Sequence, residues 1–442
     1  MTGAGWDERR LHFIGIGGAG MSGLAAVCHQ LGAKVTGSDR SPSSYIDRLA
    51  RTGVRPVIGH DENNLPDRCE VVVSTAIDDG NPELAKARQR GSRILHRSAL
   101  LAELCAAKRT IAVAGTHGKT TTTGMLIWAM RELERDPAFF IGGELPGVGI
   151  DGEPANSGWG EGEWAIVEAD ESDGSFLALD PEIAVVTNIE MDHHSRWAGL
   201  AELRAAFVEF ASKASAVVYP ESDRDLGAGL NGPRLITFDH SKPGPAELSL
   251  LVPGEHNLLD ARAALAALLT AGEEEEPAAR TLQRFPGVRR RLEFKGERNG
   301  ARIYDDYAHH PTEVRAALSA LRGLGPERLI AVFQPHLYSR TKVFSEAFGN
   351  ALALADEIVV LDVYPAREQP VGPLEGVSGL DVLRAAADRS GGATVWWAAD
   401  AGAAEEIALQ RLGPDRILVT VGAGDITRLS DRLVDGKGPG GG

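Results

Sequence analysis

Apolar residues occur along this chain in short runs that are separated by turn residues and polar segments. Several runs are rich in β-branched residues and predict buried strands, because strands of a parallel sheet are covered on both faces. They span residues 71–75, 164–170, 183–189, 328–333, 357–363 and 416–425. Helix-like segments lie between the runs, and this alternation predicts parallel α/β layers.

The alternation repeats in three segments, which predicts three domains covering residues 1–108, 109–286 and 287–442. The second boundary follows the turn signal FPG at 285–287, beside a basic run at 289–291. A chain of 442 residues is also too long for one ordinary core. The glycine-rich tail has too few apolar residues to pack, so we expect it to be disordered.

The strongest local motif in the second segment is GTHGKT, residues 115–120. It lies between a strand-like run and a helix-like segment. Glycines let backbone N–H groups close around phosphates, and the helix N-terminus adds a favourable dipole. Lys119 can reach the β- and γ-phosphates, and the Thr120 hydroxyl can ligate Mg²⁺. The strict pattern requires glycine at position 113, where this chain has Val113, so a glycine-rich turn with a surface lysine is the alternative.

Acidic residues follow two strand-like runs of the same segment. EADESD occupies 168–173, and NIEMDHH occupies 188–194. Ligands of open α/β sheets bind beyond the carboxyl ends of the strands, and clustered acids repel one another unless a cation lies among them. These residues therefore predict a cation near the phosphate loop. Acidic loops in an acidic protein are the alternative for either cluster alone.

The first segment carries Gly15, Gly17 and Gly20 after a strand-like run, with Asp39 at the end of the next run. This spacing predicts a pyrophosphate site with a ribose acceptor. The ligand could be NAD or a diphosphate attached to another ribose, such as a UDP-sugar. In the third segment, His336 and Arg340 follow a strand-like run, which suits a small polar substrate. The pair His309 and His310 lacks a third ligand at helical spacing, so we do not expect a metal there.

Composition narrows the class of protein. The net charge of −16 argues against a nucleic-acid or anionic-membrane surface, because such partners select basic patches. The three cysteines are far apart, so neither a disulfide framework nor a thiolate zinc site is indicated. We see no signal peptide and no stretch of transmembrane length, and we expect a cytoplasmic protein.

Taken together, these motifs resemble the Mur ligase family, and within it the alanine-adding branch. The blocks occur in family order and span nearly the whole chain. They are GIGGAGMS (15–22), GTHGKTTTT (115–123), EADESDGSF (168–176), TNIEMDH (187–193), GEHN (254–257), DDYAHHPTE (305–313), FQPHLYSRT (333–341), VYPA (363–366) and GAGDI (422–426).

The resemblance implies an α/β protein of three domains: an N-terminal Rossmann-like domain for the UDP substrate, a central P-loop ATP-binding domain and a C-terminal Rossmann-like domain. It implies ATP-dependent joining of L-alanine to UDP-N-acetylmuramate through an acyl phosphate in peptidoglycan and cell-wall synthesis, with ATP and Mg²⁺ required. The implied catalytic residues are Lys119, Glu171 and His193.

The resemblance also implies the binding residues. ATP would contact Gly115, Thr116, His117, Gly118, Lys119, Thr120, Thr121, His256 and Asn257. The UDP substrate would contact Gly15, Gly17, Gly18, Gly20, Ser22 and Asp39. The metal ligands would be Thr120, Glu171 and His193, with His194 as an alternative to His193. The incoming amino acid and the muramoyl end would lie near His336 and Arg340.

Three features depart from the family pattern. Asp260 replaces the second amide of the adenine-side block, Leu337 replaces a usual arginine, and the stretch 237–251 is short. The alternatives are a ligase that reattaches a recycled tripeptide to the same nucleotide, an NAD-dependent oxidoreductase and a non-catalytic nucleotide-binding regulator.

Overall fold

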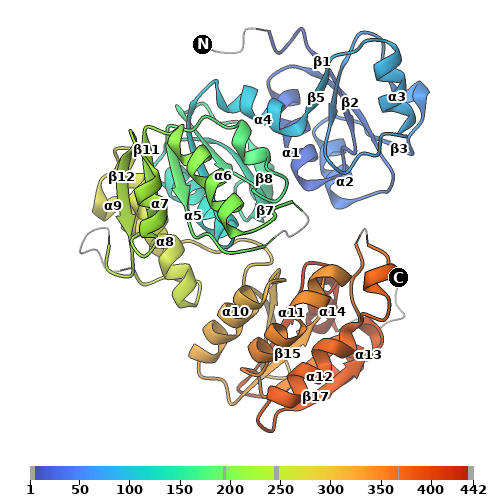
Figure 1. Cartoon of the computed structure of the whole chain (residues 1–442), viewed down its shortest axis with the longest axis vertical. Helices are drawn as coiled ribbons and strands as arrows, with labels where there is room; N and C mark the ends of the chain where they lie inside the picture. Colours follow the sequence, from blue (N-terminus) through green and yellow to red (C-terminus); the bar gives the residue numbers. More distant parts are fainter. Residues whose placement is uncertain (1–4, 193–195, 243–247, 367, 437–442) are drawn as a thin grey trace. The chain divides into compact units, whose positions relative to one another are not determined.

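The computed structural model describes residues 5–192, 196–242, 248–366 and 368–436 (Figure 1). The chain forms two compact units. The first contains Met1–Ser249 and Leu259–Phe285, and the second contains Leu250–Leu258 and Pro286–Gly442. The first unit holds two sheets and the second unit holds a third.

The first sheet has the strand order β3-β2-β1-β4-β5, with all pairs parallel. Its strands are β1 (Arg10–Ile14), β2 (Lys34–Asp39), β3 (Val57–Ile58), β4 (Glu70–Val73) and β5 (Ile94–His96). The helices are α1 (Ala19–Gln30), α2 (Ser44–Arg51), η1 (Glu62–Asn64), α3 (Pro82–Gln89) and α4 (Arg97–Cys105). One face packs against α1, α2 and α4, and the other packs against α3. This order places the loop after β1 at the centre of the carboxyl edge.

The second sheet has the order β12-β11-β10-β6-β9-β7-β8, in which only the β7–β8 pair is antiparallel. Its strands are β6 (Arg109–Ala114), β7 (Ala138–Leu145), β8 (Ala155–Gly158), β9 (Trp164–Glu168), β10 (Ile183–Val186), β11 (Ala216–Pro220) and β12 (Arg234–Phe238). The helices are α5 (Lys119–Glu132), η2 (Ile150–Gly152), η3 (Ser175–Ala178), α6 (Leu200–Ser212), α7 (Arg224–Gly229), α8 (Glu255–Thr270) and α9 (Glu275–Gln283). Strand β6, which leads into the phosphate loop, lies between β10 and β9.

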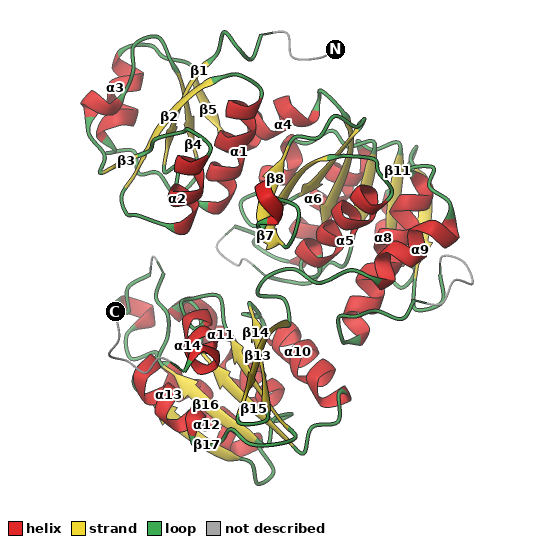
Figure 2. Ribbon diagram, turned by 180° about the vertical axis from the view of Figure 1, so that it is seen from behind, coloured by secondary structure: helices red, strands yellow, loops and turns green. Residues whose placement is uncertain are grey.

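The third sheet has the order β13-β14-β18-β15-β16-β17, with only the β13–β14 pair antiparallel. Its strands are β13 (Glu293–Arg298), β14 (Ala301–Asp306), β15 (Arg328–Phe333), β16 (Glu357–Leu361), β17 (Thr394–Ala398) and β18 (Arg416–Val421). The helices are α10 (Pro311–Gly323), α11 (Tyr338–Leu352), η4 (Gly372–Leu374), α12 (Gly379–Arg389), α13 (Ala401–Leu409) and α14 (Thr427–Asp435). Two separate cores form, one under α10, α11 and α12 and the other under α13 and α14, so helices cover both faces (Figure 2).

The predicted fold class is confirmed, because three α/β layers with mainly parallel sheets are present. Five of the six predicted strands end two to four residues earlier than the apolar runs suggest, and only β15 ends at the predicted residue. β9 ends at Glu168 and β10 at Val186, so the acids and amides that follow lie in loops at the carboxyl edge. The predicted disorder of the tail concerns residues that, beyond 436, lie outside the described part of the chain. Among the described residues, no helix has the length and apolar character needed to cross a bilayer.

Candidate active site

The phosphate loop joins β6 to α5 and depends on two glycines. Gly115 has a φ of +141° and Gly118 a φ of +81°, a region that L side chains rarely adopt. A methyl group at Gly115 would overlap the Thr187 hydroxyl, and one at Gly118 would overlap the Asp260 carboxylate. The loop therefore requires glycine at both positions, and Asp260, which departs from the family pattern, lies directly beside it.

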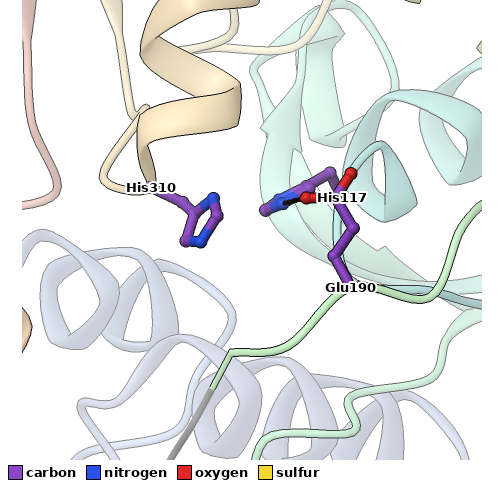
Figure 3. A group of neighbouring side chains, drawn as sticks. All are labelled: His117, Glu190 and His310. Atoms are coloured by element: carbon purple, nitrogen blue, oxygen red, sulfur yellow. Dashed lines mark ion pairs between the residues drawn. The ribbon is translucent and has the colours of Figure 1, made fainter. Parts of the chain in front are cut away.

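The segment after β10 holds this loop in place. Asn188 accepts a hydrogen bond from the His117 backbone N–H at 2.9 Å and donates one to the His117 carbonyl at 2.9 Å. The Thr116 hydroxyl donates to the Glu190 carbonyl and accepts from the Glu190 N–H, each at 2.9 Å. The His117 Nε2 lies 3.5 Å from a Glu190 carboxylate oxygen (Figure 3). The neighbouring strands β6 and β10 thus present one continuous edge.

Lys119 is folded back into the loop. Its ammonium donates to the carbonyls of Gly115 at 2.6 Å and Thr116 at 3.1 Å, and it lies 2.8 Å from Glu171, whose side chain is 1% exposed. Burial alone would lower the pKa of Lys119. The carboxylates of Glu171, Asp170 and Glu168 outweigh burial, so the pKa of Lys119 is raised above its usual value. The lysine is therefore held fully charged where a phosphate would lie.

Thr120 and Glu168 connect the start of α5 to the end of β9. The Thr120 hydroxyl donates to Glu168 at 2.9 Å, and the other carboxylate oxygen of Glu168 accepts from the Gly142 N–H at 2.6 Å. Thr121 is buried in the next position of the helix. The edge offers a hydroxyl and several carboxylates around a single ammonium, and this oxygen-rich, net negative set fits a hard divalent cation. His193 and His194 lie outside the described residues.

The glycine loop after β1 is braced by its own acid. The Gly17 N–H donates to Asp39 at 2.8 Å, and the second oxygen of Asp39 accepts from the Ser41 N–H at 3.2 Å. A side chain at Gly17 would press on Ile46 and Asp39. Gly15 has a φ of +79°. The predicted ribose acceptor therefore also fixes the shape of the loop.

A cavity of about 350 Å³ opens beside this loop. It is lined by Gly18, Ala19, Gly20, Met21, Gly23, Leu24, Ser74, Thr75, Ala76, Arg97, Leu101, Phe140, Ile141, Gly142, Asn156, Glu168 and Asp170. The lining extends from the N-terminus of α1 to the acids after β9, so residues that belong to the first and to the second sheet's layers line the same cavity. Ser22 is not among the residues that line this cavity, and its hydroxyl donates to the Ala19 carbonyl within α1 at 2.9 Å.

In the second unit, His336 and Arg340 lie together at the carboxyl edge of the third sheet. Arg340 donates to the His336 Nδ1 at 3.3 Å and is 9% exposed. The His336 ring stacks on Tyr364, with centroids 5.8 Å apart and an interplanar angle of 13°. Leu337, between them in sequence, has a φ of +69°. Such a conformation is costly for leucine and is typical of functional turns.

His256 and Asn257, at the start of α8, belong to the Leu250–Leu258 part of the second unit. Burial and the nearby Arg291 lower the pKa of His256 to about 4. The Asn257 side chain donates to the Pro253 carbonyl at 2.6 Å and is 5% exposed. The Asn257 side chain is thus bonded within its own turn, and the contact of His256 and Asn257 with adenine stays a prediction.

Sequence reasoning missed some residues that the structure brings to these edges. The sequence places Glu168 and Asn188 in two clusters after strands, but nothing in the pattern assigns Glu168 to Thr120 or Asn188 to the phosphate loop. No motif in the sequence includes Arg97. It follows β5, and a position directly after a strand of a parallel sheet is the one signal that could have identified it.

The two loops and three sheets define a class of protein with known relatives. Residues 10–109 match the Mur ligase family, catalytic domain; residues 113–243 match the Mur ligase middle domain; and residues 290–424 match the Mur ligase, glutamate ligase domain. The chain belongs to the Mur ligase family.

Its relatives include two named UDP-N-acetylmuramate–L-alanine ligases. That of Thermobifida fusca is 40% identical, with 97% of each chain covered. That of Renibacterium salmoninarum is 42% identical, with 97% of this chain and 96% of the relative covered. The crystal structure of a UDP-N-acetylmuramate–alanine ligase from Thermotoga maritima superposes with a TM-score of 0.81 at 28% identity, covering 96% of this chain and 98% of that one. The similarity thus includes both glycine loops and the third sheet.

Proposed function

We propose that this chain joins L-alanine to the muramoyl carboxylate of UDP-N-acetylmuramate, with conversion of ATP to ADP and phosphate, in peptidoglycan precursor synthesis. The observation that carries the proposal is the cavity that runs from the glycine loop of α1 to Glu168. A diphosphate at the loop would direct its sugar toward the strand end beside Lys119 and Thr120. A nicotinamide dinucleotide would leave that second loop without a role.

The three predicted domains would divide the work. Residues 1–108 would hold the UDP substrate, residues 109–286 would hold ATP, and residues 287–442 would supply His336 and Arg340 for the amino acid and the muramoyl end. ATP and nucleotide-activated sugars are cytoplasmic metabolites, so the reaction would take place in the cytoplasm.

Amide formation in water is unfavourable, so the carboxylate must first be activated. The γ-phosphoryl group of ATP passes to the muramoyl carboxylate, and the alanine amine attacks the resulting acyl phosphate and releases phosphate. Lys119 and the backbone N–H groups of residues 115–120 hold the phosphates and offset their charge, so catalysis is mainly positioning and electrostatic stabilisation. Mg²⁺ bound by Thr120 and Glu171 would neutralise further phosphate charge. His193 is proposed as a second ligand of this kind.

A phosphate-release panel tests this function. Purified chain with ATP, Mg²⁺ and UDP-N-acetylmuramate is assayed with L-alanine, glycine, L-serine and the recycling tripeptide, and each component is omitted in turn. We expect release only when all components are present, with the highest kcat/KM for L-alanine. A methyl-sized difference is worth about 1–3 kcal/mol, so discrimination against glycine should be roughly 10- to 200-fold.

Two results would overturn the proposal. Higher kcat/KM for the tripeptide would make the chain a recycling ligase. No phosphate release with any acceptor, despite binding of both nucleotides, would make it a non-catalytic binding protein.

A further inference from the structure

The cavity beside the glycine loop contains one positively charged side chain among the described residues that line it, that of Arg97. Arg97 is the first residue of α4 and follows directly after β5. Its Nη1 lies 3.7 Å from where a Cβ would stand on Gly20, at the N-terminus of α1. The guanidinium therefore faces the backbone where the diphosphate of the proposed substrate would bind.

Acids on the loop after β9 hold this guanidinium. The Arg97 Nη2 donates to Asp173 at 2.9 Å and lies 3.7 Å from Asp170. The Ser175 hydroxyl is a further acceptor at 3.4 Å. The Arg97 side chain is 22% exposed and that of Asp170 is 42% exposed, so solvent and ligands can reach the pair from the cavity.

The side chains that line the cavity carry a net negative charge, so a phosphate ligand needs a positively charged group beside it. Glu168 and Asp170 contribute two negative charges to the lining, and Arg97 contributes the single positive charge. A diphosphate would add more negative charge beside those acids, and like charges at short range oppose binding. A planar guanidinium can donate to two phosphate oxygens at once.

We propose that Arg97 binds the diphosphate of the UDP substrate and exchanges its ion pairs with the loop after β9 for that ligand. Arg97 is then a further substrate-binding residue, and its ion pair with Asp173 is the contact that the substrate replaces. The inference rests on the proposed function for the identity of the sugar nucleotide. The role of Arg97 itself needs only a nucleoside diphosphate.

The test is calorimetric titration of the full chain with UDP and with UDP-N-acetylmuramate, in the absence of ATP. Arg97→Ala should weaken both ligands by roughly 10- to 100-fold, because hydrogen bonds between charged groups contribute about 1.5–3 kcal/mol. Arg97→Lys, which keeps the charge but not the paired donors, should be intermediate. Affinity for ATP should change less than about twofold in either variant, since the phosphate loop 115–120 is untouched.

Asp173→Asn is the matched control. It removes the negative charge that pairs with Arg97 but keeps an oxygen that can accept from the Ser175 N–H, a bond of 2.8 Å. If Arg97 binds the diphosphate, this variant should bind UDP as tightly as the parent or more tightly. If Arg97 is only a structural tie, Asp173→Asn and Arg97→Ala should weaken UDP alike.

Several outcomes overturn the inference. These are equal losses in Asp173→Asn and Arg97→Ala, parental UDP affinity in Arg97→Ala, and loss of UDP-N-acetylmuramate affinity with UDP unaffected. Failure of the proposed function would give a different result. A parent chain that binds UDP-N-acetylmuramate but never ligates an amino acid would leave the conclusion about Arg97 unchanged. Should Arg97→Ala fail to fold, Arg97→Gln takes its place with the same expectations.

Discussion

The ion pair between Lys119 and Glu171 combines a structural and a functional role in one contact. The two charged groups are 2.8 Å apart, and their side chains are 14% and 1% exposed. At such burial, each charge depends on the other, because the desolvation cost is offset only by a close partner. The lysine is at the same time the cation that we propose for the phosphates of ATP.

Lys119→Ala should therefore lower both turnover and stability. We expect kcat to fall by a factor on the order of 10²–10³, as for loss of a key electrostatic donor. The free energy of unfolding should fall by about 3–5 kcal/mol, because Glu171 loses its buried counter-charge. Phosphate release and urea unfolding measure the two effects.

The double variant Lys119→Met with Glu171→Gln separates the two roles. It removes both charges, so it should recover much of the lost stability and none of the lost turnover. Near-normal turnover in Lys119→Ala would contradict the assignment of ATP to this loop.

At the scale of elements, the phosphate loop depends on backbone conformation as much as on side chains. Gly118→Ala places a side chain at a φ of +81° and against Asp260, whereas Gly147 has a φ of +75° with nothing within 4 Å of a Cβ. Both variants should lose about 1–2 kcal/mol of stability from the left-handed backbone. Only Gly118→Ala should also raise the KM for ATP, by roughly tenfold or more, because the loop must move to admit the methyl group.

Steady-state kinetics with ATP as the varied substrate, together with urea unfolding, distinguish these two glycines. If both variants have the parental KM for ATP, the 115–120 turn does not form the ATP site.

The first turn of α8 makes stability depend on pH. The folded-state pKa of His256 is about 4, below its ordinary value of about 6.5 in an unfolded chain. The native state therefore binds fewer protons than the unfolded state between these values. The contribution of neutral His256 to the free energy of unfolding is fully present above pH 6.5 and is lost as pH falls toward 4. The loss is at most about 3 kcal/mol.

His256→Gln should remove this part of the pH dependence, because glutamine does not titrate. Urea unfolding of both chains at pH 7.5 and pH 4.5 measures the difference, and acids common to both chains cancel in the comparison. Equal losses of stability in the two chains would show that His256 is not buried in its neutral form.

At the scale of the whole molecule, the third sheet carries its own cores on both faces. The clusters under α10, α11 and α12 and under α13 and α14 consist entirely of residues after 290. A chain comprising residues 286–442 should therefore fold alone and unfold cooperatively in urea. Its midpoint should be below that of the corresponding transition in the full chain, because it lacks Val252, whose side chain would lie 3.2 Å from a Cβ on Gly287.

Circular dichroism across a urea series measures this transition. A broad, non-cooperative change would mean that the Leu250–Leu258 part is required for folding of the second unit.

Local patterns in the sequence determined the strands, both glycine loops and the class of chemistry. An apolar run that ends in glycine specifies a strand and a turn through contacts within a few residues. For that reason, the positions of β9, β10 and β15 could be predicted to within two or three residues. The phosphate loop could be recognised despite Val113, since the conformations of Gly115 and Gly118 are set locally.

The tertiary structure alone decided which side chains meet. The order β10-β6-β9 brings Asn188 to the loop at 115–118 and Glu168 to Thr120, and no periodicity in the chain encodes that order. Asp39 braces Gly17 because β2 pairs with β1. Arg97 reaches Asp173, 76 residues away in sequence, through packing between two sheets. These contacts depend on how distant apolar faces bury one another, and that burial is a property of the whole fold rather than of any segment.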